Sequence, residues 1–148
     1  MTPLPLDSQP LTVLIADDHD LFASSLAELL AAYPDLNVVG RAADGAEAVL
    51  LASHLHPDVV VMDVDMPRFD GIVATHEITE KLDHTRVVVL SALTDAETAM
   101  RARSAGAAAY LFKGCPIDSL IATLRAAAGR LDGLELLERL PAAPAIAH

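Results

Sequence analysis

The chain has 148 residues, of which 53% are hydrophobic and 21% charged, and its net charge at pH 7 is −11. This length corresponds to one domain, and the apolar content is that of a globular protein rather than a disordered chain. A strongly negative surface repels phosphate backbones, so we do not expect the chain by itself to bind nucleic acid. No apolar run is long enough to span a membrane, and the single cysteine, Cys115, fits a reducing cytoplasm.

Runs rich in β-branched residues alternate along the chain with amphipathic segments. After a proline-rich, flexible arm at residues 1–10, we predict strands at residues 11–16, 36–41, 58–63, 86–90 and 107–112. Helices are predicted to follow these strands, beginning near Phe22, Asp44, Asp70, Asp95 and Pro116. Five strand–helix units predict an α/β fold with a parallel sheet covered on both faces. Right-handed crossovers favour a doubly wound, flavodoxin-like sheet of strand order 2-1-3-4-5.

The apolar positions of the helices predict which faces are buried. The stripe of the first helix is Phe22, Leu26, Leu29, Leu30 and Tyr33, and that of the last is Ile117, Leu120, Ile121, Leu124 and Leu131. The second helix is predicted to run through Ala46, Val49 and Leu50. In the third helix we expect Ala74, Thr75, Ile78 and Leu82 to face inward, and in the fourth only Ala96, Ala99 and Met100 make an apolar stripe. The fourth stripe is the thinnest, so that helix should be the most easily displaced.

Two helix starts carry capping signals. Asp44 with Glu47 resembles a capping box, and Asp70 precedes the third helix. Between the third strand and that helix, Met66-Pro67 and Asp70-Gly71 break the chain into a loop.

The third strand, Val59-Val60-Val61-Met62-Asp63, is the centre of the predicted sheet. A continuous apolar run without polar alternation is typical of a strand buried on both faces. Asp63 therefore lies at the carboxyl edge of a central strand, where open α/β sheets bind their ligands.

Polar residues follow four of the predicted strands, and the fold gathers them at one edge: Asp17, Asp18, Asp63, Ser91 and Lys113. Three carboxylates in one cleft repel one another unless a cation joins them, and a hard divalent ion such as Mg²⁺ prefers oxygen ligands. A lysine at the same edge can contact an anion. Asp63 is then placed to act as a nucleophile toward phosphorus, with metal and lysine offsetting the charge of the transferring group.

Four segments in this order resemble the receiver domain of two-component response regulators, the CheY-like superfamily. They are Leu14-Ile15-Ala16-Asp17-Asp18-His19, Met62-Asp63-Val64-Asp65-Met66-Pro67 with Asp70-Gly71, Leu90-Ser91-Ala92, and Gly106-Ala107 through Tyr110-Leu111-Phe112-Lys113. The likeness covers residues 11–131, most of the chain. The Asp-Asp-His start, Asp44-Gly45 and Leu111-Phe112-Lys113-Gly114 are most similar to the NarL/FixJ subgroup.

The resemblance implies that Asp63 takes a phosphoryl group from a phosphohistidine of a sensor histidine kinase. It also implies a Mg²⁺ site formed by Asp18, Asp63 and the backbone carbonyl of Asp65, in which Asp17 holds metal-bound water. The chain itself would not be an enzyme. His19 could reach this pocket, but a polar loop residue is the simpler interpretation.

By the same resemblance, Ser91 and Lys113 grip the phosphoryl oxygens, and Tyr110 is an aromatic switch. Many receivers have a proline after the lysine in a cis peptide, whereas this chain has Gly114. A cis bond before a residue other than proline costs about 3 kcal/mol, so we expect a trans bond, and the sequence leaves the exact reach of Lys113 open.

Two alternatives for the function stay open. Asp63-Val64-Asp65 also matches the Asp-x-Asp of haloacid-dehalogenase-like phosphatases, although there the motif follows the first strand of a longer chain. The leucine-rich residues 132–148 could be a linker, a dimerisation element or the end of the fold. We favour a linker to a helix-turn-helix DNA-binding domain that is not in this chain, and the alternative is a free-standing receiver that acts by protein contact.

Overall fold

The computed structural model describes residues 9–66, 69–92 and 95–129. Its elements alternate in the order β1 (Leu11–Ala16), α1 (Asp20–Ala31), β2 (Leu36–Ala42), α2 (Gly45–Leu55), β3 (Val59–Asp63), α3 (Gly71–Lys81), β4 (Arg86–Ser91), α4 (Ala96–Ser104), β5 (Ala109–Phe112) and α5 (Ile117–Ala127). The strands form one parallel sheet of order β2-β1-β3-β4-β5, which confirms the predicted flavodoxin-like topology.

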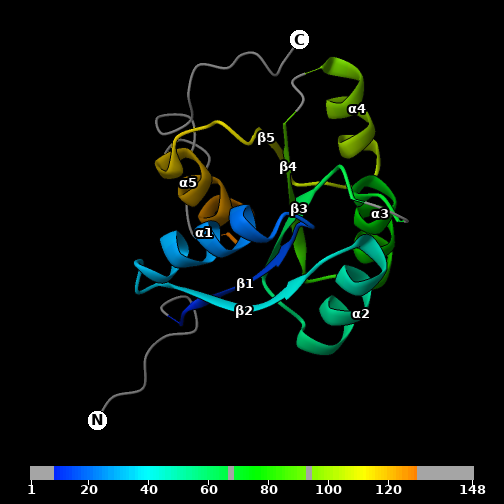
Figure 1. Cartoon of the computed structure of the whole chain (residues 1–148). Coiled ribbons are helices and arrows are strands. Elements are labelled where there is room, and N and C mark those ends of the chain that lie inside the picture. The colour runs from blue at the N-terminus through cyan, green and yellow to red at the C-terminus, as the bar shows by residue number, and fades with distance from the viewer. Residues whose placement is uncertain (1–8, 67–68, 93–94, 130–148) are drawn as a thin grey trace.

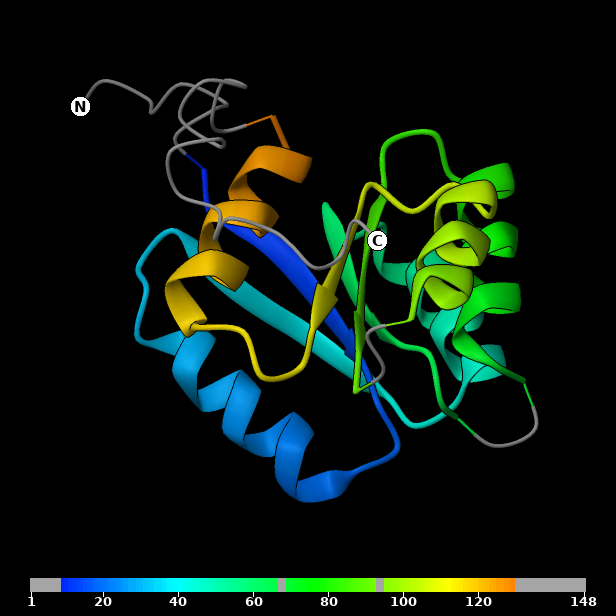
Figure 2. The ribbon, with the colours of Figure 1, turned by 90° about the horizontal axis from the view of Figure 1, so that it is seen from above.

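The helices form a layer on each side of the sheet. Helices α1 and α5 cover one face, and α2, α3 and α4 cover the other (Figures 1 and 2). Within the described residues, no helix combines the length and the apolar character needed to cross a membrane. Residues 1–8 of the arm predicted at residues 1–10 lie outside the described residues. The same is true of Leu131 and of the predicted linker at residues 132–148.

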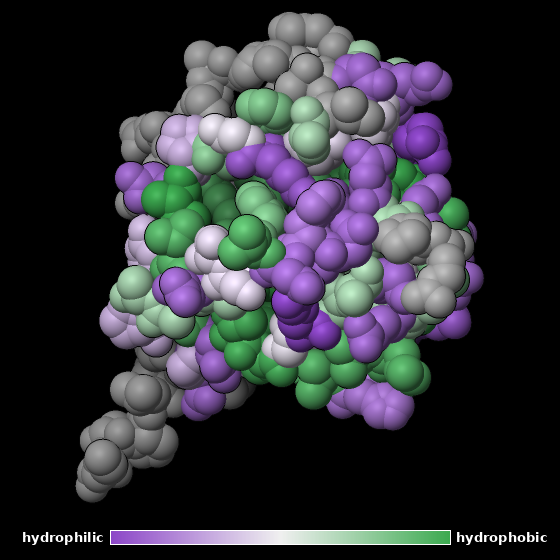
Figure 3. Space-filling model, in the orientation of Figure 1, coloured by the Kyte–Doolittle hydropathy of each residue, from purple (hydrophilic) through white to green (hydrophobic). Residues whose placement is uncertain are grey.

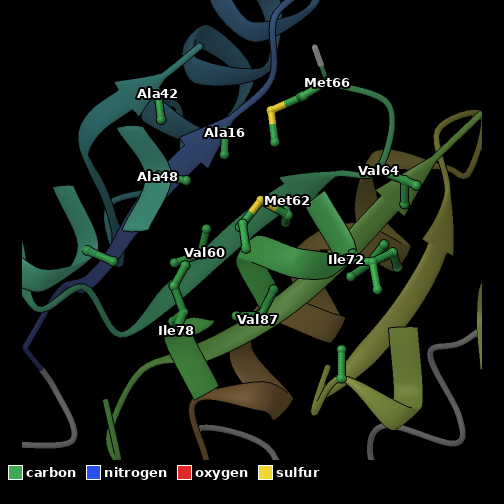
Figure 4. Close-up of a cluster of buried hydrophobic side chains, with 14 of the residues drawn as sticks. Ala16, Ala42, Ala48, Val60, Met62, Val64, Met66, Ile72, Ile78 and Val87 are labelled. Atoms are coloured by element: carbon green, nitrogen blue, oxygen red, sulfur yellow. The ribbon is translucent and has the colours of Figure 1, made fainter. Parts of the chain in front are cut away.

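The sheet separates two hydrophobic clusters, and β3 contributes to both. Val60 and Met62 point into the cluster under α2, α3 and α4, which Figure 4 shows, whereas Val59 and Val61 belong to the cluster under α1 and α5. Successive side chains of a strand point to opposite faces, so a strand covered on both sides must be apolar throughout. Every residue of β3 is buried, which confirms the prediction of a central strand ending at Asp63.

Helix α2 contains the predicted Ala46, Val49 and Leu50, but its most buried residues are smaller ones. Leu50 is 57% exposed, and the residues facing the sheet are Gly45, Ala48 and Ala52. Asp44 fixes where the helix begins, since its side chain accepts a hydrogen bond of 2.9 Å from the N–H of Glu47. From that start, the small residues fall closest to the sheet, and Val49 and Leu51 pack beside them against the same cluster.

Single positions of α1 and α4 also differ from the prediction. Leu29 is 50% exposed, and Tyr33 lies after the end of α1 at Ala31. Met100 is 68% exposed, because α4 turns Thr98 and Ala102 inward instead. Helix α4 thus has few buried contacts, as the thin stripe predicted, although different residues make them.

Candidate functional site

The ends of four parallel strands meet at one edge of the sheet. In the strand register Ala16 pairs with Met62, Asp63 with Leu90, and Ser91 with Phe112. The residues that follow or close these strands therefore come together, as predicted for Asp17, Asp63, Ser91 and Lys113. On the face shown in Figure 3, hydrophilic residues form a band over the ends of β1 and β3, flanked by more hydrophobic groups.

Two of the clustered acids are buried. Asp17 is 2% and Asp63 is 3% exposed, whereas Asp18 and His19 face solvent. One potential ligand atom from each of these four residues lies within 4.8 Å of the other three. The prediction that Asp17, Asp18 and Asp63 converge is confirmed, and a histidine nitrogen joins them.

Lys113 links the two buried carboxylates. Its Nζ lies 2.9 Å from Oδ2 of Asp17 and 3.4 Å from Oδ1 of Asp63. Burial by itself would lower the pKa of Lys113, but the hydrogen bond to Asp17 and the charge of Asp63 outweigh it and raise that pKa. The ammonium group therefore remains charged and offsets part of the repulsion between the acids.

The ionised form of Asp63 remains unfavourable in spite of this lysine. Burial and the neighbouring charge of Asp17 raise the pKa of Asp63 from 3.8 to about 6, against the lowering effects of Lys113 and of the Asp65 N–H. That N–H donates to Oδ1 of Asp63 over 3.3 Å. Oδ2 of Asp63 is buried and has no hydrogen-bond partner within the described residues.

A divalent cation fits this donor set. A buried carboxylate oxygen without a partner is costly unless a cation or a new bond reaches it. The surrounding carboxylate oxygens are the ligands that Mg²⁺ prefers. The carboxylate of Asp65, by contrast, is exposed and is not a member of the cluster.

Ser91 and Tyr110 connect the site to the neighbouring layer. Ser91 is fully buried at the end of β4, and the Tyr110 hydroxyl is hydrogen-bonded to its side chain. Burial raises the pKa of Tyr110 more than this hydrogen bond lowers it. The half-buried ring of Tyr110 packs against the cluster under α2, α3 and α4. The contact between the two residues joins the pocket to the side of the sheet that carries α4.

The loop after Lys113 contains Gly114. No cis peptide bond occurs in the described part of the chain, so the bond before Gly114 is trans, as predicted. A Cβ atom at Gly114 would collide with the ring of Phe112, which covers the glycine. Lys113 nevertheless reaches both buried acids.

The sequence did not predict the contact of Phe22 with Lys113, and it favoured a simple loop role for His19, which lies in the pocket. The Lys113 ammonium lies 4.6 Å from the centre of the Phe22 ring, which the sequence had placed only in the core stripe of α1. His19 Nδ1 lies 3.2 Å from Oδ1 of Asp17 and 3.3 Å from Oδ1 of Asp18. Closeness in sequence to the acidic pair was the available signal for both residues.

Comparison with known proteins identifies the family. The response regulator receiver domain matches residues 13–125. The transcriptional regulatory protein LiaR of Bacillus subtilis (strain 168) is 40% identical over 115 residues, which cover 78% of this chain and 54% of LiaR. The nitrate/nitrite response regulator protein NarL of Escherichia coli K12 is 35% identical over 126 residues, which cover 84% of this chain and 58% of NarL. The chain thus spans little more than half the length of these two relatives.

Another relative carries an enzymatic name. Protein-glutamate methylesterase/protein-glutamine glutaminase 4 of Myxococcus xanthus is 46% identical over 110 residues, which cover 73% of this chain. That match covers only 31% of the Myxococcus protein.

Solved structures agree with the sequence relatives. The signal receiver domain of a NarL response regulator from Mycobacterium tuberculosis superposes with a TM-score of 0.76 at 34% identity, covering 82% of this chain and 99% of that domain. A chain of the CheX–CheY–BeF₃–Mg complex from Borrelia burgdorferi gives a TM-score of 0.74 at 28% identity, covering 80% of this chain and 89% of that chain. The match to NarL-type regulators confirms the resemblance seen in the sequence. The chain therefore belongs to the family of response regulator receiver domains.

Proposed function

We propose that Asp63 accepts a phosphoryl group from a phosphohistidine of a sensor histidine kinase in the cytoplasm. This proposal rests on the buried carboxylate of Asp63. Its Oδ2 has no hydrogen-bond partner within the described residues, and Lys113 contacts its Oδ1. With a pKa of about 6, Asp63 is mostly ionised near pH 7 and can act as a nucleophile.

In the proposed step, a carboxylate oxygen of Asp63 forms a bond to phosphorus as the bond between phosphorus and the kinase imidazole nitrogen breaks. The product is an aspartyl phosphate, and the imidazole leaves with the electron pair of the broken bond. Lys113, now shared between Asp17 and Asp63, follows the negative charge onto the phosphoryl oxygens. Ser91 donates its hydroxyl to another of these oxygens.

The acidic cluster holds Mg²⁺ for this step in our proposal. Asp18, Asp63 and the backbone carbonyl of Asp65 would be its direct ligands, and Asp17 would reach it through water. The cation offsets the charge that develops on the transferring group. The Mg and BeF₃ in the name of the Borrelia CheY complex support this assignment.

Phosphorylation by acetyl phosphate tests the assignment of Asp63. Intact-mass measurement in Mg²⁺ should show one added phosphoryl group on the native chain and none on Asp63→Asn. Asp83→Asn is the matched control, because it makes the same change at an exposed carboxylate between α3 and β4, outside the cluster. An adduct that persists on Asp63→Asn would contradict the proposal.

The competing phosphatase function makes a different prediction about turnover. A receiver releases about one phosphate for each Asp63 that is phosphorylated, whereas an Asp-x-Asp enzyme hydrolyses many equivalents of a phosphomonoester such as p-nitrophenyl phosphate. The exposed position of Asp65 disfavours its use as a general acid in a closed site. Sustained turnover that is lost in Asp65→Ala would favour the phosphatase.

For the output, we propose that the full-length protein regulates transcription through a helix-turn-helix domain beyond this chain. LiaR and NarL, which carry names of transcriptional or response regulators, extend well past the matched region. The alternatives are a receiver that acts by protein contact alone and a homodimer formed by this domain. With a net charge of −11, the chain alone should bind no DNA at physiological salt in fluorescence anisotropy.

A further inference from the structure

We infer that His19 adds a nitrogen ligand to the acidic cluster, so that the pocket binds borderline transition-metal ions such as Ni²⁺ more tightly than its carboxylates alone would allow. The inference rests on the proposed metal pocket but not on phosphoryl transfer. Its first support is the buried Oδ2 of Asp63, which has no hydrogen-bond partner within the described residues.

The second support is the spacing of the potential ligand atoms. Ligands bound to one ion at roughly 2.1 Å are separated by about 3.0 Å in an octahedron and about 3.4 Å in a tetrahedron. His19 Nδ1 lies 3.2 Å from Oδ1 of Asp17 and 3.3 Å from Oδ1 of Asp18, and the ligand atom of Asp63 lies within 4.8 Å of the others. Small adjustments would therefore bring the nitrogen and a carboxylate oxygen onto one ion.

The local backbone holds the imidazole beside the acids. His19 is the residue that precedes α1, in an extended conformation, and its N–H donates to Oδ1 of Asp17 over 2.8 Å. Its side chain is 66% exposed, so the ring can turn toward an incoming ion without displacing core residues. Asp18 is also accessible, which leaves a path from solvent to the cluster.

The chemistry of the nitrogen decides which ions benefit. Mg²⁺ is a hard cation that takes oxygen ligands, and it gains little from an imidazole. Imidazole suits Ni²⁺, Cu²⁺ and Zn²⁺, whose affinities exceed that of Mn²⁺ at most nitrogen and oxygen sites. His19 should thus change the selectivity of the pocket rather than its occupancy by Mg²⁺.

Calorimetric titration of the whole chain with Ni²⁺ and, separately, with Mg²⁺ tests the inference. His19→Gln should weaken Ni²⁺ binding at this site at least tenfold and change Mg²⁺ binding less than twofold. His84→Gln is the matched control, because His84 is an exposed histidine that precedes β4, at the opposite edge of the sheet from the carboxyl ends of the strands. It should leave the affinity for both ions unchanged.

Pulsed electron paramagnetic resonance with Mn²⁺ gives a direct second measurement. Coupling of the ion to a nitrogen nucleus should be present in the native chain and absent from His19→Gln. Unchanged Ni²⁺ affinity, or equal losses for Ni²⁺ and Mg²⁺, would overturn the inference, since equal losses mean that His19 only arranges the carboxylates. Failure of the native chain to bind Mg²⁺ at all would instead contradict the proposed function.

Discussion

At the scale of single residues, the pocket keeps Asp63 reactive at the expense of stability. The carboxylate is 3% exposed, stands near Asp17, and has only partial compensation from Lys113. Natural proteins keep such arrangements at functional sites, where a perturbed pKa serves the chemistry. The same features that cost folding free energy leave an oxygen of Asp63 ready for a cation or for phosphorus.

Removing this charge should stabilise the metal-free protein in a pH-dependent way. The pKa of Asp63 is about 6 in the folded chain and 3.8 ordinarily, so its ionisation costs stability increasingly as the pH rises through this window. Above pH 6, Asp63→Asn should raise the free energy of unfolding by about 1 to 3 kcal/mol, and below pH 4 the difference should vanish. Urea denaturation in EDTA, followed by circular dichroism, measures both limits. An Asp63→Asn variant that is less stable than the native chain at pH 7 would show that ionised Asp63 does not destabilise the fold.

Phe22 should position Lys113, since the ammonium lies 4.6 Å from the centre of its ring. Such contacts contribute roughly 0.5 to 2 kcal/mol, so Phe22→Leu should slow phosphorylation by acetyl phosphate several-fold and leave Mg²⁺ affinity unchanged. Tyr33→Leu is the matched control, because its ring lies 5.7 Å from Arg125 on α5 rather than in the pocket. Equal rates for Phe22→Leu and Tyr33→Leu would show that the ring has no positioning role.

The members of the site could be predicted from the sequence, but their contacts could not. Asp63 and Lys113 follow apolar strands, and parallel strand ends must share an edge, so their convergence follows from topology. The directions of the His19 and Phe22 side chains depend on how the chain turns from β1 into α1. Hydrophobic periodicity does not predict the geometry of that turn. The turn places Phe22 beside Lys113 rather than only in the core.

At the scale of the elements, strands were predicted better than helix faces. A strand that is buried on both faces, such as β3, needs a continuous apolar run. Such a run is recognised directly in the sequence, because both of its faces must be apolar. A helix rich in alanine can rotate at little cost in buried area, so the apolar residues of α2 do not by themselves show that Leu50 is exposed. The cap at Asp44, which was predicted correctly, fixes the rotation that hydrophobicity alone left undetermined.

The caps of α2 and α4 offer a direct comparison. Asp44 and Asp95 both occupy the N-cap position, but only the side chain of Asp44 accepts a hydrogen bond from its helix. Asp44→Ala should therefore lower the free energy of unfolding by about 1 kcal/mol, and Asp95→Ala by clearly less. Neither should change the extent of phosphorylation at saturating acetyl phosphate. Thermal and urea unfolding check the stabilities, and equal losses would show that the Asp44 hydrogen bond contributes nothing specific.

At the scale of the whole molecule, the sheet lies between a firmly packed helix, α5, and a helix that is easier to move, α4. Helix α5 buries six consecutive residues from Ser119 to Leu124, whereas the buried residues of α4 are Thr98 and Ala102. Segments with few buried contacts lie at the low end of local stability. The hydrogen bond between Tyr110 and Ser91 connects the pocket to the side of the sheet that α4 covers.

Phosphorylation should use this connection to shift α4 and β5. A phosphoryl group on Asp63 brings roughly two negative charges, and Ser91 can donate to its oxygens only by loosening or sharing its bond to Tyr110. The altered contact then shifts the balance between two arrangements of α4, β5 and Tyr110 that both exist before phosphorylation.

Amide hydrogen exchange with Mg²⁺ and beryllofluoride, a phosphoryl mimic, should therefore change across residues 96–112 as well as around the pocket. Ser91→Ala is the control that separates binding from transmission, since it should keep the change near Asp63 and lose the change in α4 and β5. Exchange differences that stay within the pocket of the native chain would rule out this route, and Tyr110 would then be only a half-buried aromatic of the core.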